Sequence, residues 1–280
     1  FFVWRAFAAE AVKAYNAADA CNALVWVGPA TGDEYMNVGD SLEEMLASAP
    51  PCKDMAATMP DETAVIIHTS GTTGRPKGAE LTHFNLFSNA YTVKEQVMKP
   101  TGEDMVMVIL PLFHAFGQTC LQNAVLMGGA TMLMMQTFSI EAALRMMKVH
   151  GVTIFAAVPT IYFYMLQMPD AVRPCLESIR MAISGGAPLP AEVAEQFEIK
   201  FGKRVHEGYG LSETSPVASI NMPDDTWKPG SIGKPVWGCE MMVARFDGTE
   251  AGADEVGEIL IRGLNVMKGY YKDEVANAET

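Results

Sequence analysis

The sequence has 280 residues, of which 49% are hydrophobic and 19% are charged, and these proportions predict a packed globular core rather than an intrinsically disordered chain. The 20 Lys and Arg residues against 33 Asp and Glu residues give a formal net charge of −13, which argues against a nucleic-acid partner because such proteins normally carry a basic surface. The negative charge does not exclude a nucleotide as ligand, since a phosphate group needs only a few local donors.

The cysteines and one long uncharged stretch bear on the compartment. Five cysteines are widely spread and form no CxxC pair, which favours free thiols and a cytoplasmic location over a disulfide framework or a zinc site. Residues 105–140 contain no Asp, Glu, Lys or Arg, so a membrane span is the alternative there. Pro111, His114 and Gly128 interrupt this stretch, and a buried strand–helix–strand is favoured over a transmembrane segment. The sequence does not exclude a peripheral contact with a membrane.

Short apolar runs alternate with amphipathic stretches up to about residue 215. The opening around Trp4 and Phe7 indicates an amphipathic helix, and because Phe1 is not Met we expect an internal start. The predicted strands are residues 23–27, 64–69, 105–110, 131–135, 153–158 and 179–184. The predicted helices include residues 82–98, 117–127, 139–150 and 190–201. Strands that alternate with helices imply stacked βα subdomains with largely parallel sheets, hence an α/β fold.

The pattern changes after residue 215. Strand-like runs at 231–236, 241–245 and 256–261 follow one another with no room for crossover helices between them. They predict the start of a small β-rich subdomain. We therefore expect three parts, namely an α/β subdomain over residues 1–99, a second α/β subdomain over residues 100–215, and the β-rich subdomain over residues 216–280.

The strongest chemical signal follows the predicted strand 64–69 and precedes the predicted helix that begins near residue 82. It reads Thr69-Ser70-Gly71-Thr72-Thr73-Gly74-Arg75-Pro76-Lys77-Gly78. Its glycines let the backbone turn tightly and present N–H groups, and its hydroxyls and ammonium add donors, which suits phosphate binding better than an ordinary surface loop. A P-loop kinase or NTPase is disfavoured, because Lys77 follows Pro76 and precedes Gly78 instead of standing in Gly-Lys-Ser/Thr.

This segment resembles the phosphate loop of the adenylate-forming superfamily, which includes acyl-CoA synthetases, coumarate-CoA ligases, luciferases and the adenylation domains of peptide synthetases. The resemblance implies that the loop wraps the β- and γ-phosphates of ATP. The residues that take this role are Thr69, Ser70, Gly71, Thr72, Thr73, Gly74 and Lys77.

Further segments match this family in the same order. Residues 110–117 (Leu-Pro-Leu-Phe-His-Ala-Phe-Gly) are similar to the acyl-pocket segment, which implies substrate contacts for Phe113, His114 and Phe116. Taken alone, His114 would more often be a hydrogen-bonded core residue. Residues 184–188 lie between a strand and a helix, where open α/β sheets place their ligands. The resemblance implies that the backbone at Gly185, Gly186 and Ala187 meets the adenine and one side of the acyl tunnel, whereas the local alternative is a simple tight turn.

Residues 208–214 resemble the adenine and magnesium segment of the family. The resemblance implies that Gly208, Tyr209 and Gly210 bind the nucleotide, with Tyr209 stacked on adenine. Ser212, where the family most often has Thr, keeps the hydroxyl for the α-phosphate, and Glu213 coordinates Mg²⁺. The expected catalytic residues are accordingly His114, Ser212 and Glu213. Similar segments within residues 230–271 match the β-rich part of the family and imply a structural role.

The implied reaction is closest to that of the fatty-acyl-CoA synthetases. A carboxylate attacks the α-phosphate of Mg-ATP, pyrophosphate leaves, and the thiol of CoA then displaces AMP from the acyl-adenylate. The expected ligands are therefore ATP, Mg²⁺, CoA and a carboxylic acid. An adenylation domain for an amino or aryl acid is the nearer alternative, and a fragment that only binds nucleotide is the non-catalytic one. Neither the length of the acyl chain nor an oligomeric state follows from the sequence.

The family extends beyond the matched part on both sides. After it come an Asp that holds the ribose and a small C-terminal domain with a Lys that promotes adenylation, and the chain reaches Thr280 before either. We therefore expect a central fragment of the large N-terminal domain. Such a fragment is expected to bind nucleotide weakly and to be inactive alone.

Overall fold

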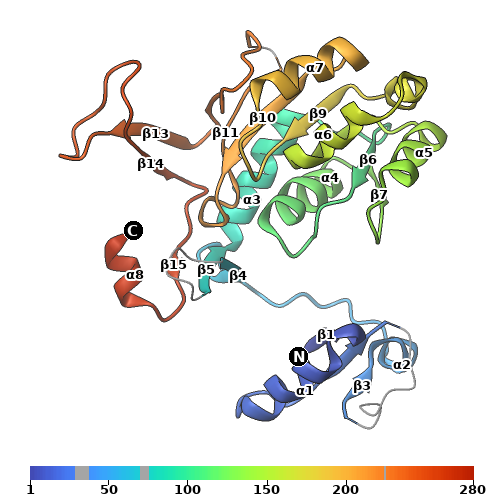
Figure 1. The fold of residues 1–280 in the computed structure, drawn as a ribbon. Helices are drawn as coiled ribbons and strands as arrows, with labels where there is room; N and C mark the ends of the chain where they lie inside the picture. The colour runs from blue at the N-terminus through green and yellow to red at the C-terminus, as the bar shows by residue number, and fades with distance from the viewer. Residues whose placement is uncertain (29–37, 70–75, 224) are drawn as a thin grey trace. The chain divides into compact units, whose positions relative to one another are not determined.

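The structure is a computed structural model that describes residues 1–28, 38–69, 76–223 and 225–280 (Figure 1). It separates into two units, residues 1–57 and residues 58–280. Within the described residues, no helix combines the length and the apolar character that crossing a bilayer requires. The subdomain boundaries expected near residues 99 and 215 stay a prediction about how the second unit is divided.

The first unit is a parallel sheet with helices beside it. Its strands, in sheet order, are β1 (Phe2–Trp4), β2 (Val25–Val27) and β3 (Asp40–Ser41), and its helices are η1 (Arg5–Phe7), α1 (Ala8–Ala17) and α2 (Leu42–Ser48). Trp26 is fully buried, and its indole N–H donates to the carbonyl oxygen of Val38 at 2.5 Å. The helix expected around Trp4 begins later, because Trp4 pairs with Val27 in the sheet.

A larger sheet forms the centre of the second unit. Across the described residues its strand order is β12 (Lys234–Pro235), β11 (Val217–Ile220), β10 (Val205–Gly210), β9 (Met181–Ser184), β8 (Ile154–Ala157), β6 (Met105–Val108) and β7 (Thr131–Met134). The five strands from β10 to β7 pair in parallel, whereas β11 and β12 extend the sheet in antiparallel fashion. This arrangement confirms the predicted α/β fold with a largely parallel sheet.

Helices cover both faces of this sheet because its central strands are apolar on both sides. In β8, Ile154 and Ala156 belong to one buried cluster, while Phe155 and Ala157 belong to the cluster on the opposite face. The first face is covered by α3 (His83–Thr92), η2 (Val93–Met98), η3 (Phe116–Asn123) and α4 (Ala124–Met127). The second face is covered by α5 (Ile140–His150), α6 (Pro159–Gln167), η4 (Asp170–Leu176) and α7 (Ala191–Phe201).

Local signals explain where several of these helices begin and end. Thr82 and Asn85 form a reciprocal capping box at the start of α3. Ser139 accepts a hydrogen bond from the N–H of Ala142 at 3.4 Å and caps α5. Gly202 ends α7 in the left-handed region, with φ of 69°. The four helices predicted from the sequence are all present, but η2 and η3 wind as π-helices, which periodicity did not indicate.

A second small sheet contains both ends of the segment Thr69–Gly78, which we call the glycine-rich segment. Its strands, in sheet order, are β15 (Gly269–Tyr270), β5 (Lys77–Thr82) and β4 (Thr63–Thr69), and both pairs are antiparallel. The segment therefore connects two paired strands, and α3 begins only after β5. Sequence reasoning missed β5, although Ala79 and Leu81, which are both buried, alternate with more polar residues.

The remaining elements lie in the last third of the chain. They are η5 (Ser212–Thr214), the antiparallel pair β13 (Cys239–Ala244) and β14 (Glu258–Gly263), and the helix α8 (Glu274–Glu279). The runs expected as strands near 241–245 and 256–261 correspond to this pair. The run at 231–236 contains β12, which belongs to the large sheet.

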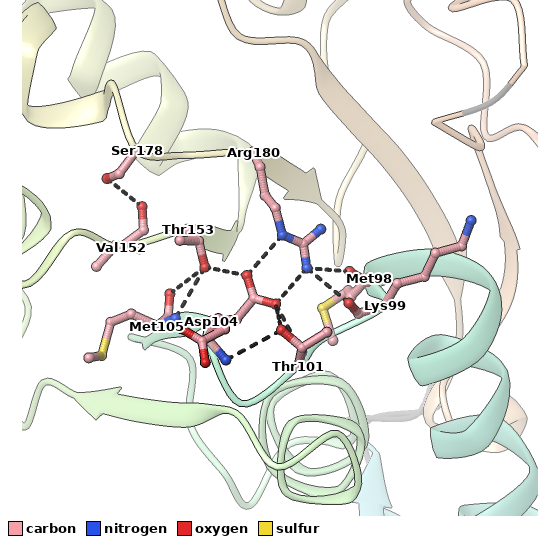
Figure 2. Close-up of polar contacts among 10 residues, drawn as sticks. Met98, Lys99, Thr101, Asp104, Met105, Val152, Thr153, Ser178 and Arg180 are labelled. Carbon is pink, nitrogen blue, oxygen red and sulfur yellow. Dashed lines mark hydrogen bonds and ion pairs between the residues drawn. The ribbon is translucent and has the colours of Figure 1, made fainter.

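A polar network joins the amino ends of three parallel strands (Figure 2). Asp104, just before β6, accepts two hydrogen bonds from the guanidinium of Arg180 at 2.8 and 2.9 Å. It also accepts one from the hydroxyl of Thr153 at 2.7 Å. Arg180 in turn donates to the carbonyl oxygens of Met98 and Lys99, at the end of η2, at 2.9 and 3.0 Å. The Arg180 hydrogen bonds hold the pKa of Asp104 well below its usual range.

Candidate active site

A cavity of about 460 Å³ lies at the carboxyl edge of the large sheet. The ends of β9 and β10 form part of it, together with residues from β4, η2, η3, η5 and β11. Open α/β sheets bind their ligands at this edge, because the loops that follow the strands diverge there.

Most of the described residues singled out in the sequence analysis line this cavity. They are Thr69, His114, Phe116, Gly185, Gly186, Gly208, Tyr209, Gly210, Ser212 and Glu213. Lys77, Phe113 and Ala187 are not among the lining residues, and the side chain of Phe113 is 84% exposed. Ser70, Gly71, Thr72, Thr73 and Gly74 lie outside the described residues. The roles expected for all these residues stay predictions.

At two lining positions the geometry of the backbone requires a glycine. Gly210 lies at a register shift between β10 and β11, where a Cβ would come within 1.8 Å of the carbonyl oxygen of Pro216. Gly186 has φ of 83°, a left-handed conformation that side chains other than glycine rarely adopt. Glycine at these two positions therefore follows from the local backbone, and both residues line the cavity.

One side of the cavity is polar. His68 and Thr69 reach it from the end of β4, and Ser212 and Glu213 reach it from η5. These residues supply hydroxyl, imidazole and carboxylate groups to the same space, next to the strand ends that border the glycine-rich segment.

The other side is apolar and had not been identified from the sequence. Its lining residues belong to the buried cluster on one face of the sheet, and they are Val93, Val97, Met98, Cys120, Ile183 and Ile220. Two of the contributing helices, η2 and η3, are the π-helical ones, a geometry that is rare and frequently found at functional sites. Burial raises the pKa of Cys120 to about 12, so its thiol stays protonated and acts as a small apolar group.

Glu213 is held by the segment around β15. The hydroxyl of Tyr270 donates to Oε1 of Glu213 at 2.7 Å, and the N–H of Met267 donates to the carbonyl oxygen of Glu213 at 2.8 Å. Burial, with the hydrogen bond to Glu213 as the next cause, raises the pKa of Tyr270 to about 12. The hydroxyl is therefore protonated at neutral pH and available as a donor.

Lys77 lies at the start of β5, opposite Thr69 of β4 in the antiparallel register. Its Nζ is 5.0 Å from the centre of the Tyr270 ring, within the range of a cation–π contact. The ring of Tyr270 thus contacts the ammonium of Lys77, while its hydroxyl contacts the carboxylate of Glu213.

His114 begins the turn into η3. Its Nδ1 accepts a hydrogen bond from the backbone N–H of Phe116 at 3.3 Å. In a neutral imidazole this bond leaves the proton on Nε2, which is then free to donate to a ligand.

The donor set around Glu213 can be compared with the needs of Mg²⁺. No group of three or more His, Cys, Asp or Glu side chains that could hold a metal ion is found among the described residues. Mg²⁺ at nucleotide sites usually takes only one or two carboxylates and completes its shell with phosphate oxygens and water. A single carboxylate on the polar side of the cavity fits this mode of binding and does not fit an all-protein cage.

Comparison with known proteins points in one direction. The model of the AMP-binding enzyme family matches residues 10–271. The long-chain-fatty-acid–CoA ligase of Bacillus subtilis (strain 168) is 38% identical over 218 residues, which are 75% of this chain and 38% of that protein. The 2-succinylbenzoate–CoA ligase of the same organism is 35% identical over 248 residues, which are 87% of this chain and 50% of that protein.

Comparison with solved structures agrees with these sequence matches. The crystal structure of ATP-bound MatB from Rhodopseudomonas palustris superposes with a TM-score of 0.81 at 30% identity, over 86% of this chain and 49% of that one. A benzoate CoA ligase from Burkholderia xenovorans gives a TM-score of 0.85 at 26% identity, over 100% of this chain and 54% of that one. The chain thus spans about half or less of the length of most of these relatives.

Proposed function

Because the chain belongs to the AMP-binding enzyme family, we propose that the protein activates a carboxylic acid with ATP and transfers the acyl group to the thiol of CoA. The observation that carries this proposal is the cavity at the carboxyl edge of the sheet, which is polar on the side of Ser212 and Glu213 and apolar on the side of η2 and η3. A polar side suits a nucleotide and a carboxylate, and an apolar side suits the tail of an acid.

The proposed chemistry has two steps. The carboxylate of the acid attacks the α-phosphorus of ATP, and the bond to pyrophosphate breaks to leave an acyl-adenylate. The sulfur of CoA then attacks the acyl carbon, its proton is lost, and AMP leaves. Both steps develop negative charge, so the side chains near the phosphates must stabilise that charge.

Groups from the polar side and from its neighbourhood would bind the nucleotide. Tyr209 would stack on adenine, and the hydroxyl of Ser212 would donate to the α-phosphate. Lys77 would neutralise charge on the outer phosphates, together with the segment that contains Ser70, Gly71, Thr72, Thr73 and Gly74. Glu213 would hold Mg²⁺, which when bound neutralises phosphate charge.

The acid would lie between the two sides. His114, whose Nδ1 is engaged by the Phe116 N–H, would offer Nε2 to the carboxylate. Phe116, Gly185 and Gly186 border the same space. The tail would then extend along the apolar side, where Val97, Met98 and Ile220 exclude water.

A fatty acid is the substrate that we propose, because the described residues of the apolar side carry no charged group that would pair with a polar tail. An aryl acid is the second candidate. It is favoured by the similarity to a protein named as a 2-succinylbenzoate–CoA ligase, which extends over a larger share of the chain than the similarity to the fatty-acid ligase.

A panel of carboxylic acids in a pyrophosphate-exchange assay on the full-length protein tests both candidates. Straight-chain fatty acids should give faster exchange than benzoate or 2-succinylbenzoate. Faster exchange with the aryl acids would select the second candidate, and no exchange with any acid would refute the proposed activity.

The proposal also includes the cellular compartment of the protein. All five cysteines are free in the structure, and free thiols are typical of a reducing compartment such as the cytoplasm. We therefore propose that the protein works in a reducing compartment such as the cytoplasm.

A further inference from the structure

Tyr270 lies at a position to which the sequence analysis gave only a structural role. Its side chain is 9% exposed and contacts two of the groups assigned to the nucleotide. The hydroxyl donates to Oε1 of Glu213 at 2.7 Å, and the ring centre is 5.0 Å from Nζ of Lys77. One buried ring therefore contacts both the carboxylate and the ammonium.

The position of this ring is set by contacts that do not involve either charged group. Tyr270 pairs with Ala79 of β5 in the small sheet. Its backbone N–H donates to Oδ1 of Asn277 at 2.6 Å, and its carbonyl oxygen accepts from Nδ2 of Asn277 at 3.0 Å. These contacts fix the backbone of Tyr270 independently of the side chains of Glu213 and Lys77, so its ring can support both.

The two charged groups would otherwise be expected to pair with each other. A carboxylate and an ammonium that form a direct ion pair neutralise one another, and each is then a weaker partner for a metal ion or a phosphate. No ion pair joins Lys77 to Glu213 in the part of the chain that the structure describes. Tyr270 instead satisfies one group with its hydroxyl and the other with its ring.

We propose that Tyr270 is a positioning residue that holds the Glu213 carboxylate toward the metal ion of the nucleotide and keeps Lys77 apart from that carboxylate. This inference rests on the proposed function of the same site. It assigns the hydroxyl to the metal side and the ring to the phosphate side, so the two contributions can be separated by substitution.

The test compares three tyrosine variants in the full-length protein and repeats Tyr270→Phe in a Glu213→Gln background. Tyr270→Phe removes the hydroxyl and keeps the ring, and Tyr270→Leu removes both. Tyr271→Phe is the matched control, because it makes the same chemical change on the neighbouring residue, whose side chain is 47% exposed. Binding of Mn²⁺ in the presence of ATP is followed by electron paramagnetic resonance, ATP affinity by calorimetry, and folding by circular dichroism.

We expect Tyr270→Phe to weaken Mn²⁺ binding by about three- to tenfold, the range for loss of one hydrogen bond, with little change in ATP affinity measured without metal. Tyr270→Leu should weaken both. Tyr271→Phe should behave as wild type. In a Glu213→Gln background, Tyr270→Phe should add little further loss, because the group that the hydroxyl positions has been neutralised.

The outcomes separate this inference from the function on which it rests. Wild-type Mn²⁺ affinity in Tyr270→Phe, with a clear loss in Glu213→Gln, would overturn the role of Tyr270 and leave the metal site in place. Wild-type affinity in both variants would instead refute the metal role of Glu213. Full additivity in the double variant would show that Tyr270 does not act through Glu213 and would overturn the proposed role.

Discussion

The side chain of Lys77 is a useful place to begin at the scale of single residues, because it carries a charge next to the segment expected to hold the phosphates. Its ammonium contacts the buried ring of Tyr270, and a partly desolvated cation–π pair of this kind is worth about 1–2 kcal/mol. A phosphate can replace this contact, because it offers charge-assisted hydrogen bonds worth about 1.5–3 kcal/mol each. Lys77 is therefore available to an incoming triphosphate without a strong competing ion pair.

Replacing this lysine should slow the first step. Lys77→Ala removes a charge-assisted hydrogen bond worth about 1.5–3 kcal/mol, which corresponds to roughly one to two decades in the rate of adenylation. Pyrophosphate exchange by the full-length protein measures the effect. Lys272→Ala is the matched control, since the ammonium of Lys272 also contacts a tyrosine ring, that of Tyr271, at 4.9 Å. Equal rates of pyrophosphate exchange in Lys77→Ala and wild type would show that Lys77 does not act at the site.

Gly186 offers a test of where the acyl tail runs. A side chain here would border the cavity, and φ of 83° would strain it. Gly186→Trp should therefore block the tail, and long fatty acids should lose more rate than acetate or propionate. Gly186→Ala is the control, because it introduces the backbone strain without the bulk. The measurement is the rate of pyrophosphate exchange with each acid. An equal loss of rate at every chain length would show that the tail does not run past Gly186.

At the scale of elements, the Asp104 network explains how one edge of the sheet is held while the other is left for ligands. Arg180 donates to the carbonyl oxygens of Met98 and Lys99, which lie at the end of η2, where carbonyl groups have no N–H partner within the helix itself. Met98 also lines the apolar side of the cavity. The ion pair of Asp104 and Arg180 thus connects the amino edge of the sheet to the helix that borders the proposed acyl site.

This network predicts a pH dependence of stability. The pKa of Asp104 is lowered from its ordinary value of 3.8, so its ionised form stabilises the fold above that value, and the contribution is lost as pH falls through the lower pKa of the folded state. Asp104→Asn should destabilise the protein at pH 7 by about 1–3 kcal/mol, less than a fully buried pair, since Arg180 is 40% exposed.

The same substitution should also flatten the fall in stability on acidification. Denaturant unfolding of Asp104→Asn and wild type at a series of pH values between 7 and 3 measures both effects. Glu103→Gln, a neighbouring exposed carboxyl, is the control and should follow wild type. A difference between Asp104→Asn and wild type that does not shrink toward acid pH would contradict the role given to the ionised carboxylate.

At the scale of the whole molecule, the described lining of the cavity offers polar groups to the proposed nucleotide but no cation for the proposed adenylation step. Among the described residues that line it, none is Lys or Arg. Negative charge develops around the α-phosphate in the first step, and a cation placed there lowers the barrier. The resemblance to the adenylate-forming superfamily assigns this role to a lysine in a C-terminal domain that follows the part matched here.

A polypeptide of these 280 residues is therefore predicted to form no measurable acyl-CoA. It should bind ATP weakly, through the groups on the polar side of the cavity. Chromatographic detection of acyl-CoA from the purified polypeptide, with the full-length protein as the positive control, tests this. Acyl-CoA turnover by the 280 residues alone would overturn the role that the resemblance gives to the additional domain.

Much of the fold followed from local patterns. Apolar periodicity depends on neighbours a few residues away, and the strands and helices that it predicted are present, with caps at Ser139, Thr82 and Gly202 in the structure. The ordered motifs likewise indicated the family, because a loop that must bind a phosphate or approach a base constrains consecutive residues. For the same reason the sequence marked His114, Tyr209 and Glu213 as residues of a single site.

Other features depended on contacts that no local pattern specifies. Tyr270 meets Glu213 across 57 residues of sequence only because β15 pairs with β5, and Arg180 meets Asp104 across 76 residues because β9 and β6 lie in one sheet. The apolar side of the cavity likewise required the packing of η2 and η3 on the sheet before Val97 or Cys120 could be distinguished from any other core residue. The sequence by itself thus determined the family and the polar motifs, whereas the tertiary structure decided which distant side chains support them, since such pairings arise from chain topology and not from local preference.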